Sequence, residues 1–142
     1  MRHTATLLAA ATIALAGCGP LVTRADLTAN QPVLDITVEA PLGPTYRRVA
    51  NLTRDCFSRS GWLFDSAADS VHSDYFEAEG FGEISGHTAA PTWTMVGWLV
   101  ELRRVSPEST RARLWKRVGA FTDPQHTWWR GVLSGSITAC EM

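Results

Sequence analysis

Apolar and polar residues alternate from residue 34 to residue 39, in the order Leu-Asp-Ile-Thr-Val-Glu. A period of two is typical of a strand that buries one face. Pro41 and Pro44 end this strand, because proline has no amide hydrogen to give to a sheet. Over residues 45–59 the apolar positions recur at the spacing of a helix instead. We therefore expect a strand over 34–39 and a helix over 45–59, which Ser60-Gly61 would end.

The region between residues 62 and 120 predicts a run of strands joined by short turns. The expected strands cover residues 62–64, 71–79, 81–88, 92–105 and 110–120. Glycines at positions 80 and 82 lie where the second of these strands gives way to the third, as in a bulge or a tight hairpin. The strand over 92–105 is apolar on both faces in its first half, as a central strand would be.

The last predicted element is a helix that begins at Asp123 and Pro124. Aspartate is a preferred N-cap, and proline is favoured at the first helical position. One broad face of this helix consists of Trp128, Trp129, Val132, Leu133 and Ser136, and Cys140 lies just past its end. The two apolar helix stripes need a sheet to cover them. The chain therefore predicts an α+β domain, an antiparallel sheet with two helices packed on one face in the order β-α-β(n)-α.

This order of elements resembles a reduced helix-grip fold, in which an antiparallel sheet wraps a long C-terminal helix. The resemblance rests on residues 36–41, Ile-Thr-Val-Glu-Ala-Pro, and on the helix that follows them. A shared topology carries no function with it. The resemblance therefore implies an architecture only.

The first 18 residues have the composition of an export signal. Arg2 and His3 supply positive charge, and an uncharged apolar run covers residues 5–16. That run is too short for a membrane-spanning helix, which needs about 20 apolar residues. Leu15-Ala16-Gly17-Cys18 resembles the lipobox of bacterial lipoprotein precursors at all four positions. The alternative is an ordinary signal peptide with a chance cysteine.

The lipobox resemblance implies that the chain is cut before Cys18 and that the Cys18 thiol carries a diacylglyceryl group with acyl chains such as palmitate. Several acyl chains anchor a protein stably, where a single chain binds only marginally. On this interpretation residues 1–17 are the signal peptide, 18–32 are the lipidated N-terminus and tether, and 33–142 are a single domain. Gly19 stands where an aspartate would favour the inner membrane, so the resemblance favours the outer membrane, facing the periplasm.

The chain has three cysteines, of which the lipobox assigns Cys18 to the lipid. Cys56 and Cys140 then remain as an even pair in an oxidising compartment, where such pairs form disulfides. Cys56 lies near the end of the first expected helix and Cys140 just after the second, so a bridge would clasp the two helices together. The alternative is two separate buried thiols. An isolated pair without nearby histidines does not indicate a metal site.

The charge balance excludes one class of partner. The chain carries 13 Lys and Arg against 14 Asp and Glu, a formal net charge of −1. Nucleic-acid binding calls for a basic excess, so we expect no nucleic-acid partner. The sequence also lacks a nucleophile elbow, a P-loop, a dinucleotide fingerprint and an H-E-x-x-H motif. We predict no catalytic residue and no cofactor.

Two polar clusters are weaker candidates for chemistry. His72 and Asp74 share a strand face and could hold a metal together with His87, but solvent-facing residues on an edge strand explain them more simply. The acidic residues between positions 74 and 83 could supply paired carboxylates for acid–base chemistry. We expect them instead to face arginines on neighbouring strands. No metal site is predicted.

A sharper candidate is a basic stripe on the strand over 110–120, where Arg111, Arg113, Trp115 and Arg117 share one face. Arginines beside an exposed tryptophan suit anionic lipid headgroups or an acidic surface of an envelope protein. We predict this face as a binding surface. The alternative is that Trp115 covers a second, smaller core while the arginines are solvated.

The sequence leads to a ranked set of functions. The first is a non-enzymatic, lipid-anchored envelope lipoprotein with an interaction or structural role in the periplasm. The second is a carrier or sensor of a hydrophobic ligand, which would need an apolar cavity under the C-terminal helix. The third is a small hydrolase, which no motif supports.

Overall fold

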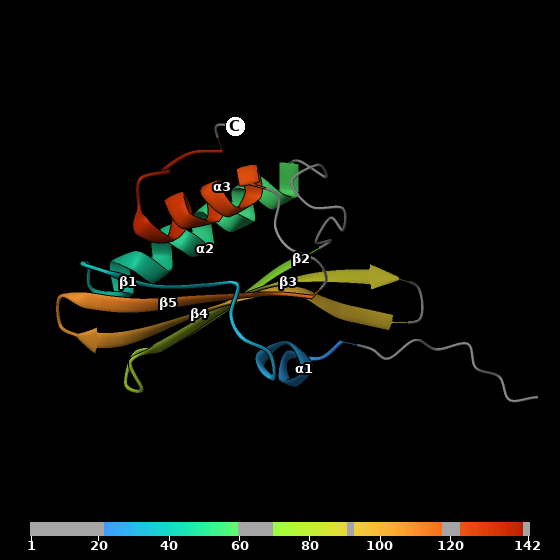
Figure 1. Cartoon of the computed structure of the whole chain (residues 1–142), viewed down its shortest axis with the longest axis horizontal. Helices are drawn as coiled ribbons and strands as arrows, with labels where there is room; N and C mark the ends of the chain where they lie inside the picture. The colour runs from blue at the N-terminus through green and yellow to red at the C-terminus, as the bar shows by residue number, and fades with distance from the viewer. Residues whose placement is uncertain (1–21, 60–69, 91–92, 118–122, 141–142) are drawn as a thin grey trace, which may run out of the picture.

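The computed structural model describes residues 22–59, 70–90, 93–117 and 123–140. Within these residues the chain forms one five-stranded antiparallel sheet with the strand order β1-β5-β4-β3-β2. The strands are β1 (Leu34–Val38), β2 (Ser70–Phe76), β3 (Phe81–Ala90), β4 (Trp93–Ser106) and β5 (Ser109–Lys116). Strands β2 to β5 follow one another as a meander, and β1 lies beside the last of them (Figure 1).

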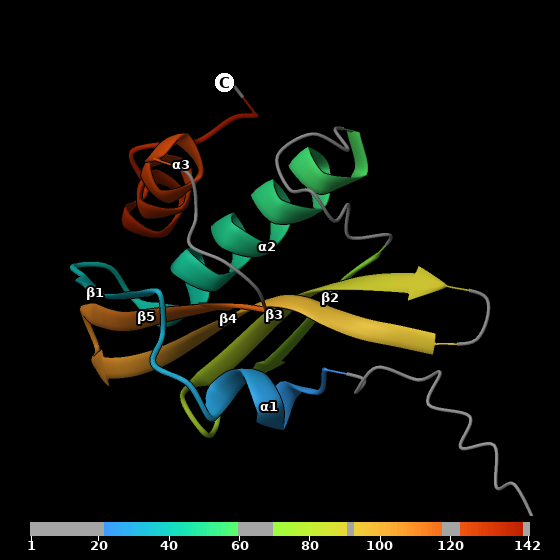
Figure 2. The ribbon, with the colours of Figure 1, turned by 45° about the vertical axis from the view of Figure 1, so that its right-hand side comes forward.

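Helices cover both faces of this sheet, unequally. The two long helices, α2 (Leu42–Arg59) and α3 (Asp123–Ser134), lie on one face, and the short helix α1 (Arg24–Thr28) lies on the other (Figure 2). The predicted α+β class is confirmed, as is the placement of two helices on one face. No helix within the described ranges has the length and apolar character needed to span a membrane.

The helix layer differs from the arrangement that the helix-grip resemblance implies. The longer helix is α2, with 18 residues, whereas the C-terminal α3 has 12. Helix α2 packs across β2 to β5, and α3 packs on α2 and β1. Arg48 of α2 donates a hydrogen bond of 3.0 Å to the carbonyl of Leu133, which joins the two helices near the end of α3.

Several predicted boundaries are wrong by a few residues. Helix α2 begins at Leu42 rather than at 45, because proline at position 44 is tolerated in the first turn of a helix. Strand β2 ends at Phe76, and a turn follows that closes at Gly80, whose φ of 61° suits glycine. Strand β5 ends at Lys116, short of the predicted end at 120, and residues 118–120 lie outside the described residues. The strand predicted over 62–64 and the helix stop at 60–61 also lie outside them.

The segment predicted as a tether contains folded structure. Helix α1 starts with a capping box between Thr23 and Asp26, and its Leu27 is buried on the sheet beside Leu99 and Trp115. The domain therefore begins no later than Val22, instead of at residue 33. A helix of five residues with one buried side chain leaves no periodic pattern, which is why the sequence did not reveal it.

The main core lies between the two long helices and the sheet. Its centre is aromatic: Phe57 stacks on Trp98 with ring centroids 4.9 Å apart, and Trp129 meets Trp98 edge-on at 5.1 Å. Trp128 and Trp129 are buried as expected, whereas Ser136 lies beyond the helix and is exposed. Among the described residues, aromatic and aliphatic side chains of α2, α3 and the sheet therefore pack together into this core.

Candidate functional site

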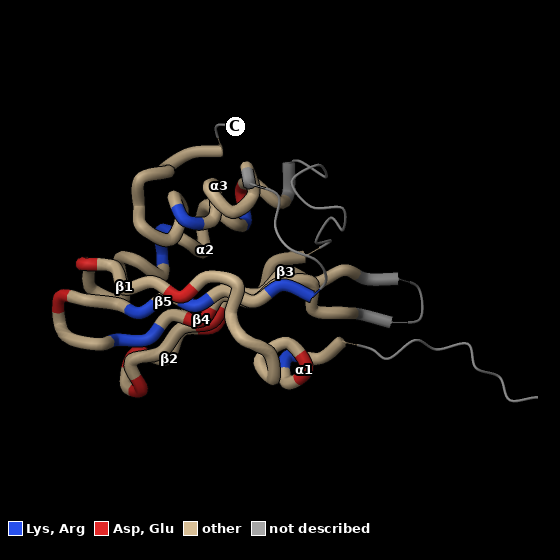
Figure 3. Tube along the Cα trace, in the orientation of Figure 1, with Lys and Arg blue, Asp and Glu red and all other residues tan. Residues whose placement is uncertain are grey.

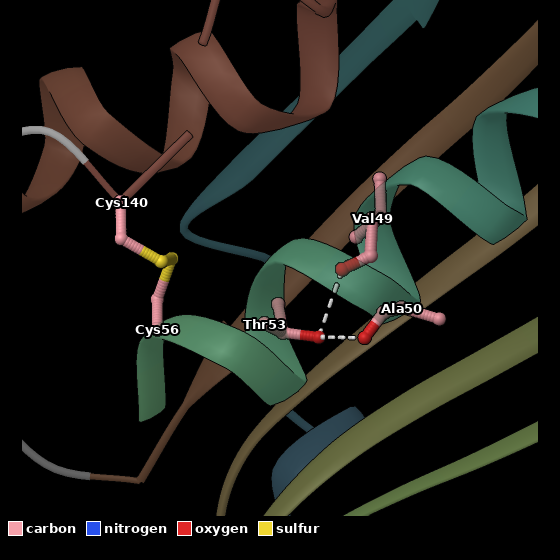
Figure 4. Close-up of a disulfide and its surroundings, with 5 residues drawn as sticks. All are labelled: Val49, Ala50, Thr53, Cys56 and Cys140. Atoms are coloured by element: carbon pink, nitrogen blue, oxygen red, sulfur yellow. Dashed lines mark hydrogen bonds between the residues drawn. A yellow bond between two sulfur atoms is a disulfide. The ribbon is translucent and has the colours of Figure 1, made fainter. Parts of the chain in front are cut away.

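The predicted disulfide is present. Cys56 near the end of α2 and Cys140 after α3 form a bridge with their Cα atoms 5.3 Å apart and 84 residues apart in the chain (Figure 4). Cys56 is buried, and one turn earlier the hydroxyl of Thr53 donates to the carbonyl of Val49 at 2.8 Å. The bridge confirms the prediction that the two cysteines clasp the helices.

The sheet face opposite the long helices carries most of the charged residues that the sequence singled out. Positions of opposite charge lie on neighbouring strands (Figure 3), and ion pairs join Arg111 to Asp35 and Arg113 to Glu101. Arg111 of β5 forms a two-pronged ion pair with Asp35 of β1, with N–O distances of 2.8 and 2.6 Å. That arginine lowers the pKa of Asp35 through its hydrogen bonds and its charge.

Glu101 of β4 is the centre of a second charge cluster on the same face. Arg103 approaches it at 3.1 Å, and Arg113 also pairs with it across the strands. The side chain of Glu101 is only 6% exposed. Burial acts to raise the pKa of Glu101, but the hydrogen bonds and charges of Arg103 and Arg113 outweigh burial, so this pKa lies below its usual value.

Asp74, Glu83 and Glu101 form a row of carboxylates across three neighbouring strands, and their negative charges would repel one another without a cation beside them. In the strand register Asp74 lies opposite Glu83, and Glu83 lies opposite Glu101. Arg24 of α1 reaches over this row, 2.6 Å from Glu83 and 3.9 Å from Glu101. Within the predicted acidic stretch, Glu83 forms an ion pair with an arginine, and that arginine comes from the segment that the sequence assigned to a tether rather than from a neighbouring strand. The strand arginines Arg103 and Arg113 pair with Glu101 instead.

Trp115 is not the exposed tryptophan that the basic stripe required. Its side chain is 5% exposed and packs with Leu27 and Leu99 in a second, smaller core. Its indole N–H donates to the carbonyl of Asn30 at 3.0 Å. The alternative interpretation of Trp115 is confirmed, because α1 covers it, although Arg111 and Arg113 are ion-paired rather than only solvated.

Arg117 lies apart from the other three residues of the predicted surface. Its backbone N–H donates to the carbonyl of Gly97 at 3.0 Å, and its exposed guanidinium contacts the sulfur of Met95. It therefore sits at the end of the sheet where β4 begins. Arg111, Arg113 and Trp115 alternate along one face of β5, but Arg117 lies beyond the end of this strand, so the four residues do not form one continuous basic surface.

His72 and His87 lie together in a hollow of about 250 Å³, beside Arg24 and Ser85. Their rings are 4.4 Å apart, and Ser85 and His87 share a hydrogen bond of 2.9 Å. Burial, and then the charge of His72, lower the pKa of His87. This contact resembles a nucleophile with its base, but in the described part of the chain no carboxylate is hydrogen-bonded to His87. Nor do the described residues include three His, Cys, Asp or Glu placed to hold a metal ion.

A second hollow, of about 420 Å³, lies where α2 begins and β4 turns into β5. We call it the proline-lined hollow, since Pro41, Pro44 and Pro107 form part of its wall. Arg47 and Arg104 bring positive charge to it, and Glu77 and Tyr75 complete its polar side. Phe76 and Val105, each next in the chain to a lining residue, are 46% and 61% exposed but do not line the hollow. Sequence reasoning missed this hollow, because its residues come from three separate connections.

The two hollows lie away from α3, so neither is the cavity that a carrier of hydrophobic ligands would need. The comparisons with known proteins add no constraint on these assignments. Neither a protein-family model nor a curated protein matches this sequence.

Proposed function

We propose that this protein is a lipid-anchored, non-enzymatic protein of the bacterial envelope, facing the periplasm, that binds an envelope protein through the proline-lined hollow. The anchor follows from the lipobox resemblance at Cys18. A disulfide between Cys56 and Cys140 suits an oxidising compartment, where such bridges persist. A core of packed aromatic and aliphatic side chains between the helices and the sheet supports an interaction domain.

The observation that carries the binding role is the chemistry of the proline-lined hollow. Arg47 and Arg104 are both exposed, and they outnumber the single carboxylate of Glu77. Pro41, Pro44 and Pro107 supply apolar surface beside these charges. The hollow therefore suits a protein segment in which an acidic side chain stands beside apolar ones.

The walls of the hollow are preorganised for binding. Pro41 and Pro44 fix their own backbone at the start of α2, and Thr45 donates its N–H to the carbonyl of Pro41 at 3.2 Å. A surface that is already rigid loses less conformational entropy when a partner binds. The proposed partner site thus needs no rearrangement of the domain.

Charge reversal tests the binding role. The tagged full-length protein would be cross-linked in the envelope, and its partners would be identified by mass spectrometry. Arg47→Glu with Arg104→Glu should reduce recovery of the main partner at least fivefold. Arg130→Glu, an exposed arginine on α3, is the matched control and should leave recovery unchanged. Equal recovery by the double variant and the control would overturn the proposed site.

The anchor is tested separately at Cys18. Cys18→Ser should leave an unprocessed precursor that takes up no palmitate analogue, as judged by intact mass and metabolic labelling. A shortened, membrane-bound and lipid-carrying Cys18→Ser product would show that the anchor assignment is wrong.

A further inference from the structure

One end of the sheet is tied to the chain segment that leads to the lipid. Val22 accepts a hydrogen bond of 3.2 Å from the backbone N–H of Val96, and its side chain packs against the second core beneath α1. The capping box of α1 follows at once, which holds Thr23 and Asp26 together. Val22 is therefore a fixed point of the folded domain rather than part of a long tether.

The distance from this fixed point to the lipid is short. Residues 19–21 separate Cys18 from Val22. Four residue steps of extended chain span at most about 14 Å. The lipidated residue thus lies within about 14 Å of Val22. A tether over residues 18–32 would have let the whole domain move far from the lipid, but three intervening residues keep Val22 close to it.

The two ends of the sheet are well separated. Met95, Val96 and Arg117 lie with Val22 at one end, which we call the anchor end. From Val96 to Ser106, β4 advances by ten residue steps, or about 33 Å at the usual rise of a strand. The start of β4 and the β4–β5 turn lie at opposite ends of the sheet (Figure 1). Glu108 lies in that turn. Its distance from Val22 therefore exceeds the maximum distance of about 14 Å between Val22 and the lipidated Cys18.

We propose that the domain rests on its own membrane by the anchor end, which points the β4–β5 turn and the proline-lined hollow away from the bilayer. The partner of the anchor end is the surface of the membrane that holds the lipid on Cys18. An exposed cation at Arg117 beside the half-buried Met95 and Val96 suits a layer of anionic headgroups over acyl chains. This inference rests on the proposed lipidation, and it adds a fixed orientation to it.

Site-specific photo-crosslinking of the full-length protein in intact membranes tests the orientation. A benzophenone amino acid would replace either Arg117 or Glu108, which flank the same strand, β5, and are both exposed. Phospholipid adducts at position 117 should exceed those at position 108 at least fivefold. Equal adduct yields, or a higher yield at position 108, would overturn the orientation.

A variant with a longer tether provides a second test of the orientation by the same photo-crosslinking measurement. Twelve glycine and serine residues inserted between Cys18 and Val22 should bring the two adduct yields to within twofold of each other. A preference for position 117 that survives the insertion would overturn the role of the short tether. An intact mass without a diacylglyceryl group on Cys18 would instead remove the anchor itself, and the orientation with it. Anchored protein with equal yields would leave the lipid assignment standing while the orientation fails.

Discussion

The indole N–H of Trp115 donates a hydrogen bond of 3.0 Å to the backbone carbonyl of Asn30, 85 residues earlier in the chain. This bond joins the central part of the sheet to the segment just after α1. With Leu27 packed on the same tryptophan, it turns an N-terminal segment into part of the domain.

Leu27→Ala should weaken this docking. A buried leucine truncated to alanine costs about 2–5 kcal/mol, and we expect the lower end because the second core is small. Urea unfolding measures the loss, and hydrogen exchange of residues 23–30 should rise at the same time. Val33→Ala removes apolar atoms from a side chain that is 37% exposed and should cost less than about 0.5 kcal/mol. A stability for Leu27→Ala equal to that control would contradict the docked position of α1.

Loss of either cysteine of the bridge should cost the same, and loss of both should cost no more. The cross-link spans 84 residues, for which loop-closure entropy corresponds to about 4.5 kcal/mol. Cys56→Ser, Cys140→Ser and the double variant would be compared by thermal unfolding of the exported domain. Summed losses would indicate two independent thiols instead of one bridge. Two reactive thiols per denatured, non-reduced molecule would lead to the same conclusion.

Glu101→Gln should make stability less dependent on acid pH. The pKa of Glu101 is lower in the folded protein than in the unfolded chain, where it is about 4.3. Ionised Glu101 therefore stabilises the fold at pH values above about 4.3, and this stabilisation is lost as the pH falls through the folded pKa. The wild-type free energy of unfolding should thus fall more steeply below about pH 4.5 than that of the variant. At pH 7 the variant should be less stable by about 1–3 kcal/mol, since Arg103 and Arg113 lose their shared carboxylate.

Urea titrations from pH 3 to pH 7 provide this comparison. Glu108→Gln, in the exposed β4–β5 turn, is the control and should follow the wild-type profile. Parallel profiles for Glu101→Gln and the wild type would show that Glu101 is not the group that titrates.

Gly86→Ala should destabilise the main core. A Cβ atom added to Gly86 would lie 2.1 Å from Nε1 of the buried Trp98, so the indole or the strand would have to move. Overpacking of this kind costs about 1–3 kcal/mol. Near-ultraviolet circular dichroism should also change, because Trp98 stacks on Phe57. Gly43→Ala, whose added Cβ would lie 3.3 Å from the hydroxyl of Tyr75, should be close to neutral by both measurements.

The parts of the fold that the sequence predicted are those that one segment encodes by itself. Alternation in Leu34, Ile36 and Val38 predicted β1, and helical spacing predicted α2 and α3. The position of Cys56 and Cys140 relative to those helices was enough to predict the bridge. These patterns follow from burial of one face, which local sequence records directly.

The parts that could not be predicted depend on which segments meet. The alternation of residues along β5 is the same whether Trp115 is exposed or buried. Trp115 is buried because α1 packs over it, and the sequence of β5 does not contain that information. Glu101 is surrounded by arginines from α1, β4 and β5, so no single strand reveals its charge cluster. The proline-lined hollow likewise combines three connections that are far apart in the chain.

The pairing of β1 with β5 affects the order in which the domain can be completed. Leu34 lies opposite Leu114 and Val38 opposite Thr110, so the first strand has no partner until nearly the whole chain has emerged. Until then α2 can pack only on the strands that precede β5, namely β2 to β4. Contacts between residues so distant in sequence slow folding. The first strand should therefore join the sheet last, and the domain is complete only once β5 is available to a chain that is made from its N-terminus.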